Sequence, residues 1–248
     1  MSRINRAFTV VEVLVVIGII GVLMAILLPT LEKAREQGNV VKCANNLRTI
    51  GQSILIYSNE NHGSYPRTRY IPDAPLAFGT NPASPDPFAA TGPVANDVTA
   101  ALFLLVRDER VPVEMFICPY DDVNAWQPDP APDAASRSNF TDYRKNLGYS
   151  FANPYPGTAA EDAGYTFTSH MRGAFAIAAD MNPGTGGIRN SESHEDRGQN
   201  VLYADGHVDW VTSPLVGIDN DNIYTARTGA VVASPVDGND SVLLPAQP

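Results

Sequence analysis

The stretch RAFTVVEVLVVIGIIGVLMAILLP, residues 6–29, decides what the fold is built around. From Phe8 to Leu28 it holds 21 residues with one charge, Glu12. A helix rises about 1.5 Å per residue, so this run spans about 30 Å, the thickness of a bilayer core. The length predicts a membrane-spanning helix. Glu12 needs a separate explanation, because a charge at mid-bilayer costs about 2.5–3.5 kcal/mol on insertion scales.

Two ordinary classes of apolar segment explain this stretch incompletely. A secretory signal peptide has an apolar part of about 7–15 residues that ends in small residues before its cleavage site. Here the run is longer, and Pro29-Thr30-Leu31 does not form such a site. A plain membrane anchor fits the length but has no use for Glu12. An uncleaved anchor with a stray acid is therefore the simpler alternative to a segment in which Glu12 has a purpose.

Residues Arg6 to Glu12, RAFTVVE, resemble the N-terminus of type IV prepilins and type II secretion pseudopilins. In that family a basic leader ends in Gly, or sometimes Ala, a dedicated peptidase cuts before a Phe, and the new N-terminus is methylated. The fifth mature residue is Glu. The resemblance implies a leader over residues 1–7, cleavage between Ala7 and Phe8, methylation of the Phe8 amine and an assembly role for Glu12. It also gives Glu12 a partner, the terminal amine of a neighbouring subunit, since opposite charges in an apolar bundle are tolerable only together.

Beyond Pro29 a helical pattern resumes, with apolar residues at three- to four-residue steps and charged residues mostly on other faces. These apolar positions are Leu31, Ala34, Val41, Ala44, Leu47, Ile50, Ile54 and Tyr57. The pattern predicts one helix from about 8 to 59, bent or loosened at Pro29. Residues 8–29 would span the membrane or form a filament core. Residues 30–60 would form an amphipathic continuation that packs on a sheet.

The charge of the chain indicates which partners it can have and how it is oriented in a membrane. Its 248 residues carry a net charge of −10, which would become −12 once Arg3 and Arg6 leave with the leader. No basic patch is present to neutralise phosphates, so we expect no nucleic acid partner. Basic residues precede the apolar helix and an acidic domain follows it, which fits the positive-inside pattern. We expect a single-pass protein of the inner (cytoplasmic) membrane, with a cytoplasmic N-terminus and a periplasmic or extracellular C-terminal domain.

Residues 61–248 read as one globular domain with long loops. Residues 71–96 hold six prolines and predict a surface loop, and Asp97 is a candidate cap for a short helix over 98–108. Strands are expected at 115–118, 147–153 and 173–180, and a hairpin over 200–211. The Asp205-Gly206 pair between alternating apolar residues predicts a type I′ turn, with positive φ at both positions. The expected fold class is α+β and pilin-like: a long helix on a small antiparallel sheet.

Four patches of the domain resemble a set of bacterial pseudopilin-like proteins that carry a His-x9-Asp-Gly motif. They are NLRTIGQSILIYSNENHGSYP (46–66), FICPYDD (116–122), ADMNPG (179–184) and HEDRGQNVLYADGHVDW (194–210). In this chain ten residues separate His194 from Asp205, and the extra residue falls around Asp196-Arg197. This second resemblance implies an architecture and an assembly class, and it implies no particular chemistry.

The candidates for chemistry in the domain are weak. His194, His207, Asp205 and Asp209 fall within 16 residues but match no metalloprotease or zinc-finger spacing, so the hairpin motif is expected to be structural. No nucleophile constellation or phosphate loop is present, and we expect no enzyme and no cofactor. Asp219 and Asp221 lie in an oxygen-rich loop that would suit calcium, although such loops are also common turns. Cys43 and Cys118 are the only cysteines, and an extracytoplasmic location permits a disulfide between them without requiring it.

These observations favour a prepilin-peptidase-processed pseudopilin, a structural subunit of a type II secretion or type IV pilus-like filament, extracted from the inner membrane on assembly. The partners implied by the resemblance are the prepilin peptidase and other pseudopilin subunits. The alternative is a membrane-anchored extracytoplasmic binding module that does not polymerise. A third hypothesis is a metal-dependent surface enzyme that uses His194 and His207.

Overall fold

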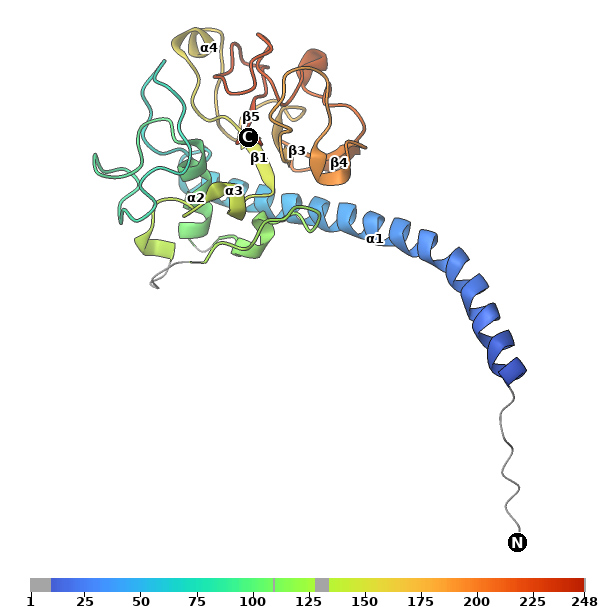
Figure 1. Ribbon diagram of the computed structural model, residues 1–248. Coiled ribbons are helices and arrows are strands. Elements are labelled where there is room, and N and C mark those ends of the chain that lie inside the picture. Colours follow the sequence, from blue (N-terminus) through green and yellow to red (C-terminus); the bar gives the residue numbers. More distant parts are fainter. Residues whose placement is uncertain (1–9, 109, 128–133, 248) are drawn as a thin grey trace. The chain divides into compact units, whose positions relative to one another are not determined.

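A computed structural model describes residues 10–108, 110–127 and 134–247 (Figure 1). The predicted leader, Ala7 and Phe8 lie outside the described residues. The chain divides into two compact units, residues 1–39 and residues 40–248. The longest helix, α1 (Val10–Glu60), contributes residues to both, and Pro29 lies inside it without ending it. The long helix that the apolar periodicity predicts is therefore confirmed over the described residues.

In the first unit, α1 presents apolar side chains on every face. Its large apolar side chains from Val10 to Leu31 are all 46–82% exposed. Among the described residues, α1 is the one helix long and apolar enough to cross a membrane, and the mean hydropathy of its most apolar 18-residue window is 3.0. None of that window is buried.

The second unit is built around a five-stranded antiparallel sheet with the order β4-β3-β2-β1-β5. The strands are β1 (Tyr149–Ala152), β2 (Ala176–Asp180), β3 (Gln199–Tyr203), β4 (Val208–Val211) and β5 (Leu243–Leu244). The first three are buried along their whole length, whereas β4 at the edge is partly exposed. The strands β1 to β4 lie side by side in the order in which they follow one another along the chain. The strand β5, from the C-terminal part of the chain, pairs with β1 and forms the edge opposite β4.

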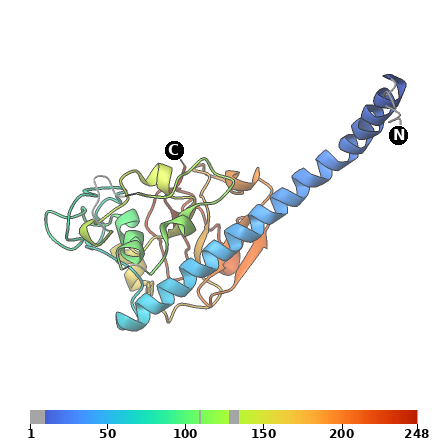
Figure 2. The ribbon, with the colours of Figure 1, turned by 90° about the horizontal axis from the view of Figure 1, so that it is seen from below.

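The second half of α1 packs on this sheet, as Figure 2 shows where the light-blue part of the helix runs beside the strands. Leu47, Ile50 and Ile54 are buried in the main core. The helix lies close to β3 at Gly51, where an added Cβ atom would lie 2.9 Å from the methyl carbons of Leu202. Toward β1, the Asn46 side-chain amide donates to the hydroxyl of Tyr149 at 3.1 Å. The expected α+β architecture, a long helix on a small antiparallel sheet, is confirmed.

The remaining helices are short. They are α2 (Val98–Arg107), α3 (Tyr143–Asn146) and α4 (Thr158–Asp162), with 3-10 turns η1 (Val113–Phe116), η2 (Ala134–Ser136), η3 (Glu192–His194) and η4 (Ile218–Asn220). Asp97 caps α2 as predicted, because its carboxylate accepts from the backbone N–H of Ala100 at 3.0 Å. Residues 66–96 form no helix or strand beyond an isolated bridge, which fits the predicted loop.

Two expectations for the domain were wrong or incomplete. The segment 115–118 was expected to be a strand and is not one. Its first residues belong to the 3-10 turn η1, and the N–H of Ile117 donates to the Glu114 carbonyl at the end of that turn. The strand β5 was missed, because Leu243 and Leu244 form too short an apolar run to signal a strand. Its place is set by pairing with Phe151 and Ala152 of β1, which only the folded chain brings near.

Candidate functional site

The exposed apolar surface of α1 over residues 10–31 is the first candidate site. A soluble monomer rarely exposes so large a contiguous apolar surface, and such surfaces mark contacts with membranes or with other proteins. Glu12 lies in the first turn of the described helix and is exposed. An acid amid apolar side chains at the start of a membrane-length helix is the geometry that the prepilin resemblance implies. The cleavage position, Ala7 and Phe8, lies outside the described residues.

The second candidate site lies inside the domain, where Cys43 and Cys118 meet. Cys43 projects from α1 and Cys118 follows η1, and both side chains are 0% exposed. Their Sγ atoms lie 2.7 Å apart, closer than an ordinary non-bonded contact but longer than the roughly 2.05 Å of a disulfide. The structure holds them as free thiols, and pairing stays a prediction. The neighbouring Cys43 and burial raise the pKa of the Cys118 thiol, which keeps it protonated.

The imidazole of His194 lies beside these two thiols, a proximity that the sequence did not predict. Its Nε2 lies 3.9 Å from the Sγ of Cys118 and 3.3 Å from Oδ2 of Asp180 at the end of β2. The rings of Tyr120 and Trp210 pack around the imidazole, with centroids 5.4 and 5.2 Å away. Burial would lower the pKa of His194, but the hydrogen bonds to Asp180 and Cys118 and the nearby carboxylate charge outweigh it and raise that pKa to about 10.

Asp180 was missed because nothing in the sequence around ADMNPG marks its carboxylate as functional. In the structure Asp180 is 0% exposed, and neighbouring groups hydrogen-bond to both its side chain and its backbone. Its Oδ2 accepts from the backbone N–H of Asn200 at 2.6 Å and from the Asn200 amide at 3.1 Å. Its backbone carbonyl accepts from the hydroxyl of Tyr224 at 2.8 Å. The available signal was an acid that ends a wholly apolar strand, a position where an unpaired charge would be costly.

The hairpin motif does not place His194 beside His207. The His207 ring stacks on Tyr203, with centroids 4.4 Å apart, and contacts the carboxylate of Asp205 on the exposed side of the turn. Between His194 and the hairpin, Glu195 and Asp196 both adopt left-handed backbone conformations, with φ of 56° and 59°. Asp196 belongs to the Asp196-Arg197 pair around which the extra residue of the ten-residue spacing is expected. The hypothesis of an enzyme that uses His194 and His207 together has no support in this arrangement.

The turn at Asp205-Gly206 differs from the expected type I′ geometry. Gly206 has φ of 89°, as predicted, but Asp205 is not at positive φ. The N–H of Gly206 donates to the Tyr203 carbonyl at 2.9 Å, and the N–H of Tyr203 donates to the His207 carbonyl at 3.0 Å. This is a three-residue loop in which a turn is followed by a left-handed glycine, the next commonest hairpin connection after the two-residue turns. The hairpin therefore needs one left-handed residue, Gly206, to match the twist of β3 and β4, and not the two that a type I′ turn requires.

Gly206→Ala is expected to lower the free energy of unfolding by about 1 kcal/mol, because a Cβ is disfavoured in the left-handed region. Nothing lies within 4 Å of the Cβ that the substitution would add, so backbone strain is the whole effect. For a domain of this size the melting temperature should fall by about 2–4 °C. Thermal unfolding of the detergent-purified chain measures it, with the exposed His207→Ala as the control that should change little. An unchanged melting temperature for Gly206→Ala would contradict the strain argument.

An arginine side chain lies beside the acidic residues of the candidate calcium loop. Arg227 lies among three carboxylates, with its guanidinium nitrogens 3.8 Å from Asp219, 3.8 Å from Asp221 and 3.5 Å from Asp237. Asp219 is exposed, whereas Asp221 is buried and accepts from the backbone N–H of Ser241 at 2.8 Å. Burial raises the pKa of Asp221 to about 7 despite that hydrogen bond. Arg227 already supplies positive charge here, and calcium at Asp219 and Asp221 stays a prediction.

Comparison with known proteins bears on the first candidate site. The family model of the prokaryotic N-terminal methylation motif matches residues 2–28. The type II secretion system core protein G of Dickeya chrysanthemi is 29% identical over 92 residues, which is 37% of this chain and 60% of that protein. The chain thus matches less than two thirds of that relative's length. No solved structure matches. The chain therefore carries a prepilin-type N-terminal methylation motif and is a weak homologue of a type II secretion core protein.

Proposed function

We propose that this chain is a pseudopilin-like structural subunit, cut by a prepilin peptidase between Ala7 and Phe8 and assembled through α1 into a type II secretion or type IV pilus-like filament. The observation that carries the proposal is the methylation motif over residues 2–28 together with the exposed apolar surface of α1 that begins in it. A helix that is apolar all round must be covered by lipid or by other apolar helices. Storage in the membrane and packing in a filament are two ways to cover the same surface.

The arrangement of the chain supports a single-pass location in the inner membrane. Arg3 and Arg6 precede the apolar helix, and the acidic domain follows it, so the N-terminus would be cytoplasmic and the domain periplasmic or extracellular. The proposed partners are the prepilin peptidase and other pseudopilin subunits. We assign no catalytic role, and the membrane-anchored binding module is the outcome expected if processing occurs but no filament forms.

Processing is the direct test of the proposal. The intact mass of the chain extracted from membranes should show loss of residues 1–7 and the addition of one methyl group at Phe8. Ala7→Gly should leave cleavage intact, whereas a bulky residue at position 7 should block it, because the peptidase acts on a small residue in the proteins this segment resembles. Recovery of Met1 or Ser2 at the N-terminus of the wild-type protein would show that the segment is an uncleaved anchor.

Processing alone does not distinguish a filament subunit from a sorted binding module. Co-expression with a type II secretion assembly machinery, followed by shearing and sedimentation, separates the two. The proposal predicts that the processed chain appears in sheared filaments. A processed chain found only in membranes under conditions where a known pseudopilin assembles would favour the binding module.

A further inference from the structure

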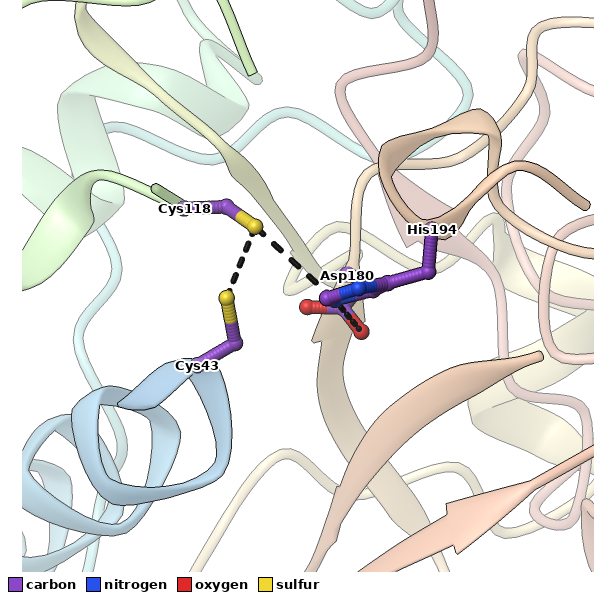
Figure 3. A group of neighbouring side chains, drawn as sticks. All are labelled: Cys43, Cys118, Asp180 and His194. Carbon is purple, nitrogen blue, oxygen red and sulfur yellow. Dashed lines mark hydrogen bonds and ion pairs between the residues drawn. The ribbon is translucent and has the colours of Figure 1, made fainter. Parts of the chain in front are cut away.

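Four metal-ligating side chains from four separate segments converge in the domain core. Cys43 comes from α1, Cys118 from the segment after η1, Asp180 from the end of β2 and His194 from η3. One ligand atom from each lies within 4.8 Å of all the others, and all four residues are buried (Figure 3). Among the residues that the structure describes, this is the one group of at least three His, Cys, Asp or Glu side chains that meets this criterion.

The protein alone leaves this cluster incompletely satisfied. Oδ1 of Asp180 and Nδ1 of His194 are buried and have no hydrogen-bond partner. Buried polar atoms are almost always paired, so two unpaired atoms on adjoining side chains call for an explanation. The same cluster holds two thiols at 2.7 Å, closer than two uncharged sulfur atoms prefer to lie. A cation bound by both sulfurs as thiolates would separate them, and one bound through Oδ1 of Asp180 would also give that atom a partner. Nδ1 of His194 would stay unpaired, because Nε2 is the nitrogen that faces the cluster.

The donor set selects the cation. Two sulfurs, one imidazole nitrogen and one carboxylate oxygen suit zinc, which prefers four-coordinate tetrahedral sites with Cys and His ligands. Zinc bond lengths of about 2.0–2.3 Å place tetrahedral neighbours about 3.3 Å apart for N and O and about 3.6 Å for S and N. The structure has 3.3 Å from His194 to Asp180 and 3.9 Å from His194 to Cys118. The two sulfurs would have to separate by about 1 Å to reach the roughly 3.8 Å of a tetrahedron.

We propose that Cys43, Cys118, Asp180 and His194 form a structural zinc site that fastens α1 to the sheet. Binding of Zn²⁺ releases the thiol protons of Cys43 and Cys118 and the Nε2 proton of His194 to solvent, so that neutral His194 is the third ligand and the Asp180 carboxylate the fourth. Four protein ligands leave no open position, and the burial of all four side chains leaves no route for substrate, which are the properties of a structural rather than a catalytic site.

Groups around the four ligands are arranged as an outer shell. Asn200 holds the Asp180 carboxylate with two N–H donors, at 2.6 and 3.1 Å, as partners of ligating carboxylates commonly do. Asn200 also donates to the backbone carbonyl of Val40 on α1 at 3.3 Å, so the same residue touches both the ligand and the helix. The hairpin residue Trp210 packs against His194. The site would thus give the histidine of the His-x10-Asp-Gly motif a role separate from that of the Asp-Gly turn.

A disulfide between Cys43 and Cys118 is the competing fate of the thiols. It requires a two-electron oxidant from the extracytoplasmic compartment and leaves Asp180 and His194 without a function. Zinc and a disulfide are mutually exclusive, because thiolates that bind the metal are not available to form the S–S bond. The two states therefore differ in metal content and in thiol count, and both quantities are measurable on one sample.

The test uses the full-length chain, purified in detergent through a tag without histidines and without chelators. Elemental analysis by mass spectrometry should find about one zinc per chain, and alkylation after unfolding with a chelator should modify both cysteines. Cys43→Ser, Asp180→Asn and His194→Ala should each lose most of the zinc. His207→Ala is the matched control, because this exposed histidine lies outside the cluster, and it should keep the wild-type zinc content.

Wild-type protein provides a second measurement that does not depend on whether the variants fold. Zinc is removed with a chelator under reducing conditions and replaced by Co²⁺, which should give the thiolate-to-metal absorption and the visible bands of tetrahedral cobalt. Wild-type protein without zinc, whose cysteines resist alkylation until reduced, would establish the disulfide and overturn the proposal. Free thiols together with no zinc and no cobalt spectrum would overturn it as well. Zinc retained by both Cys43→Ser and His194→Ala would place the metal elsewhere.

Discussion

Leu47→Ala should lower the free energy of unfolding of the domain by about 3 kcal/mol, within the roughly 2–5 kcal/mol typical of buried leucines. Leu47 is 0% exposed and belongs to the main core, where the second half of α1 meets the sheet. The substitution removes apolar burial and leaves a cavity that close-packed neighbours fill only in part. The melting temperature of the detergent-purified chain should fall by about 6–12 °C, measured by the loss of near-ultraviolet circular dichroism.

Val41→Ala is the matched control, because Val41 lies on the same helix and is 59% exposed. We expect a change within about 0.5 kcal/mol, since few buried contacts are lost. Equal effects of the two substitutions would mean that α1 does not contribute a buried face to the domain. A large difference would establish that the chain from residue 40 onward is stabilised by the same helix whose earlier residues are exposed and apolar.

Local patterns in the sequence were enough to predict the helix and the hairpin. Apolar residues at three- to four-residue steps around Leu47 and Ile50 reported which face of α1 is buried, because helix periodicity maps directly onto one face. Asp97 marked the start of α2, and Gly206 marked a left-handed position. Each of these signals involves residues within a few positions of one another, so no knowledge of the tertiary fold was needed.

The features that depend on distant parts of the chain could not be predicted in this way. Cys118 and Asp180 lie 62 positions apart, and only the pairing of strands with α1 packed above them brings both to His194. The turn at Asp205 was assigned the wrong type because the Asp-Gly pair fits both a two-residue and a three-residue loop. The register of β3 and β4, with Leu202 opposite Val208, selects the longer one.

Glu12→Val should leave membrane insertion intact and abolish filament assembly. Removing the acid takes a costly charge out of an apolar helix, so insertion should be as efficient as for the wild type or better. In the proposed filament, however, the Glu12 carboxylate meets the methylated amine of a neighbouring subunit inside the apolar bundle. Without it that amine is left buried and unpaired, which is far more costly than losing an exposed ion pair. Membrane fractionation measures insertion, and sedimentation of sheared filaments measures assembly.

Two further substitutions separate the charge of Glu12 from its position. Glu32→Val removes another exposed acid of α1, outside the membrane-length segment, and should leave assembly unchanged because no subunit amine is proposed to lie near it. Glu12→Asp keeps the charge but shortens the side chain by one methylene group, which moves the carboxylate away from the neighbouring amine. Assembly should therefore be reduced rather than lost. If Glu12→Val assembled in normal yield, the pairing with a neighbouring amine would be refuted. Glu12 would then be an incidental acid in a membrane anchor, since the apolar surface of α1 would suffice to hold subunits together.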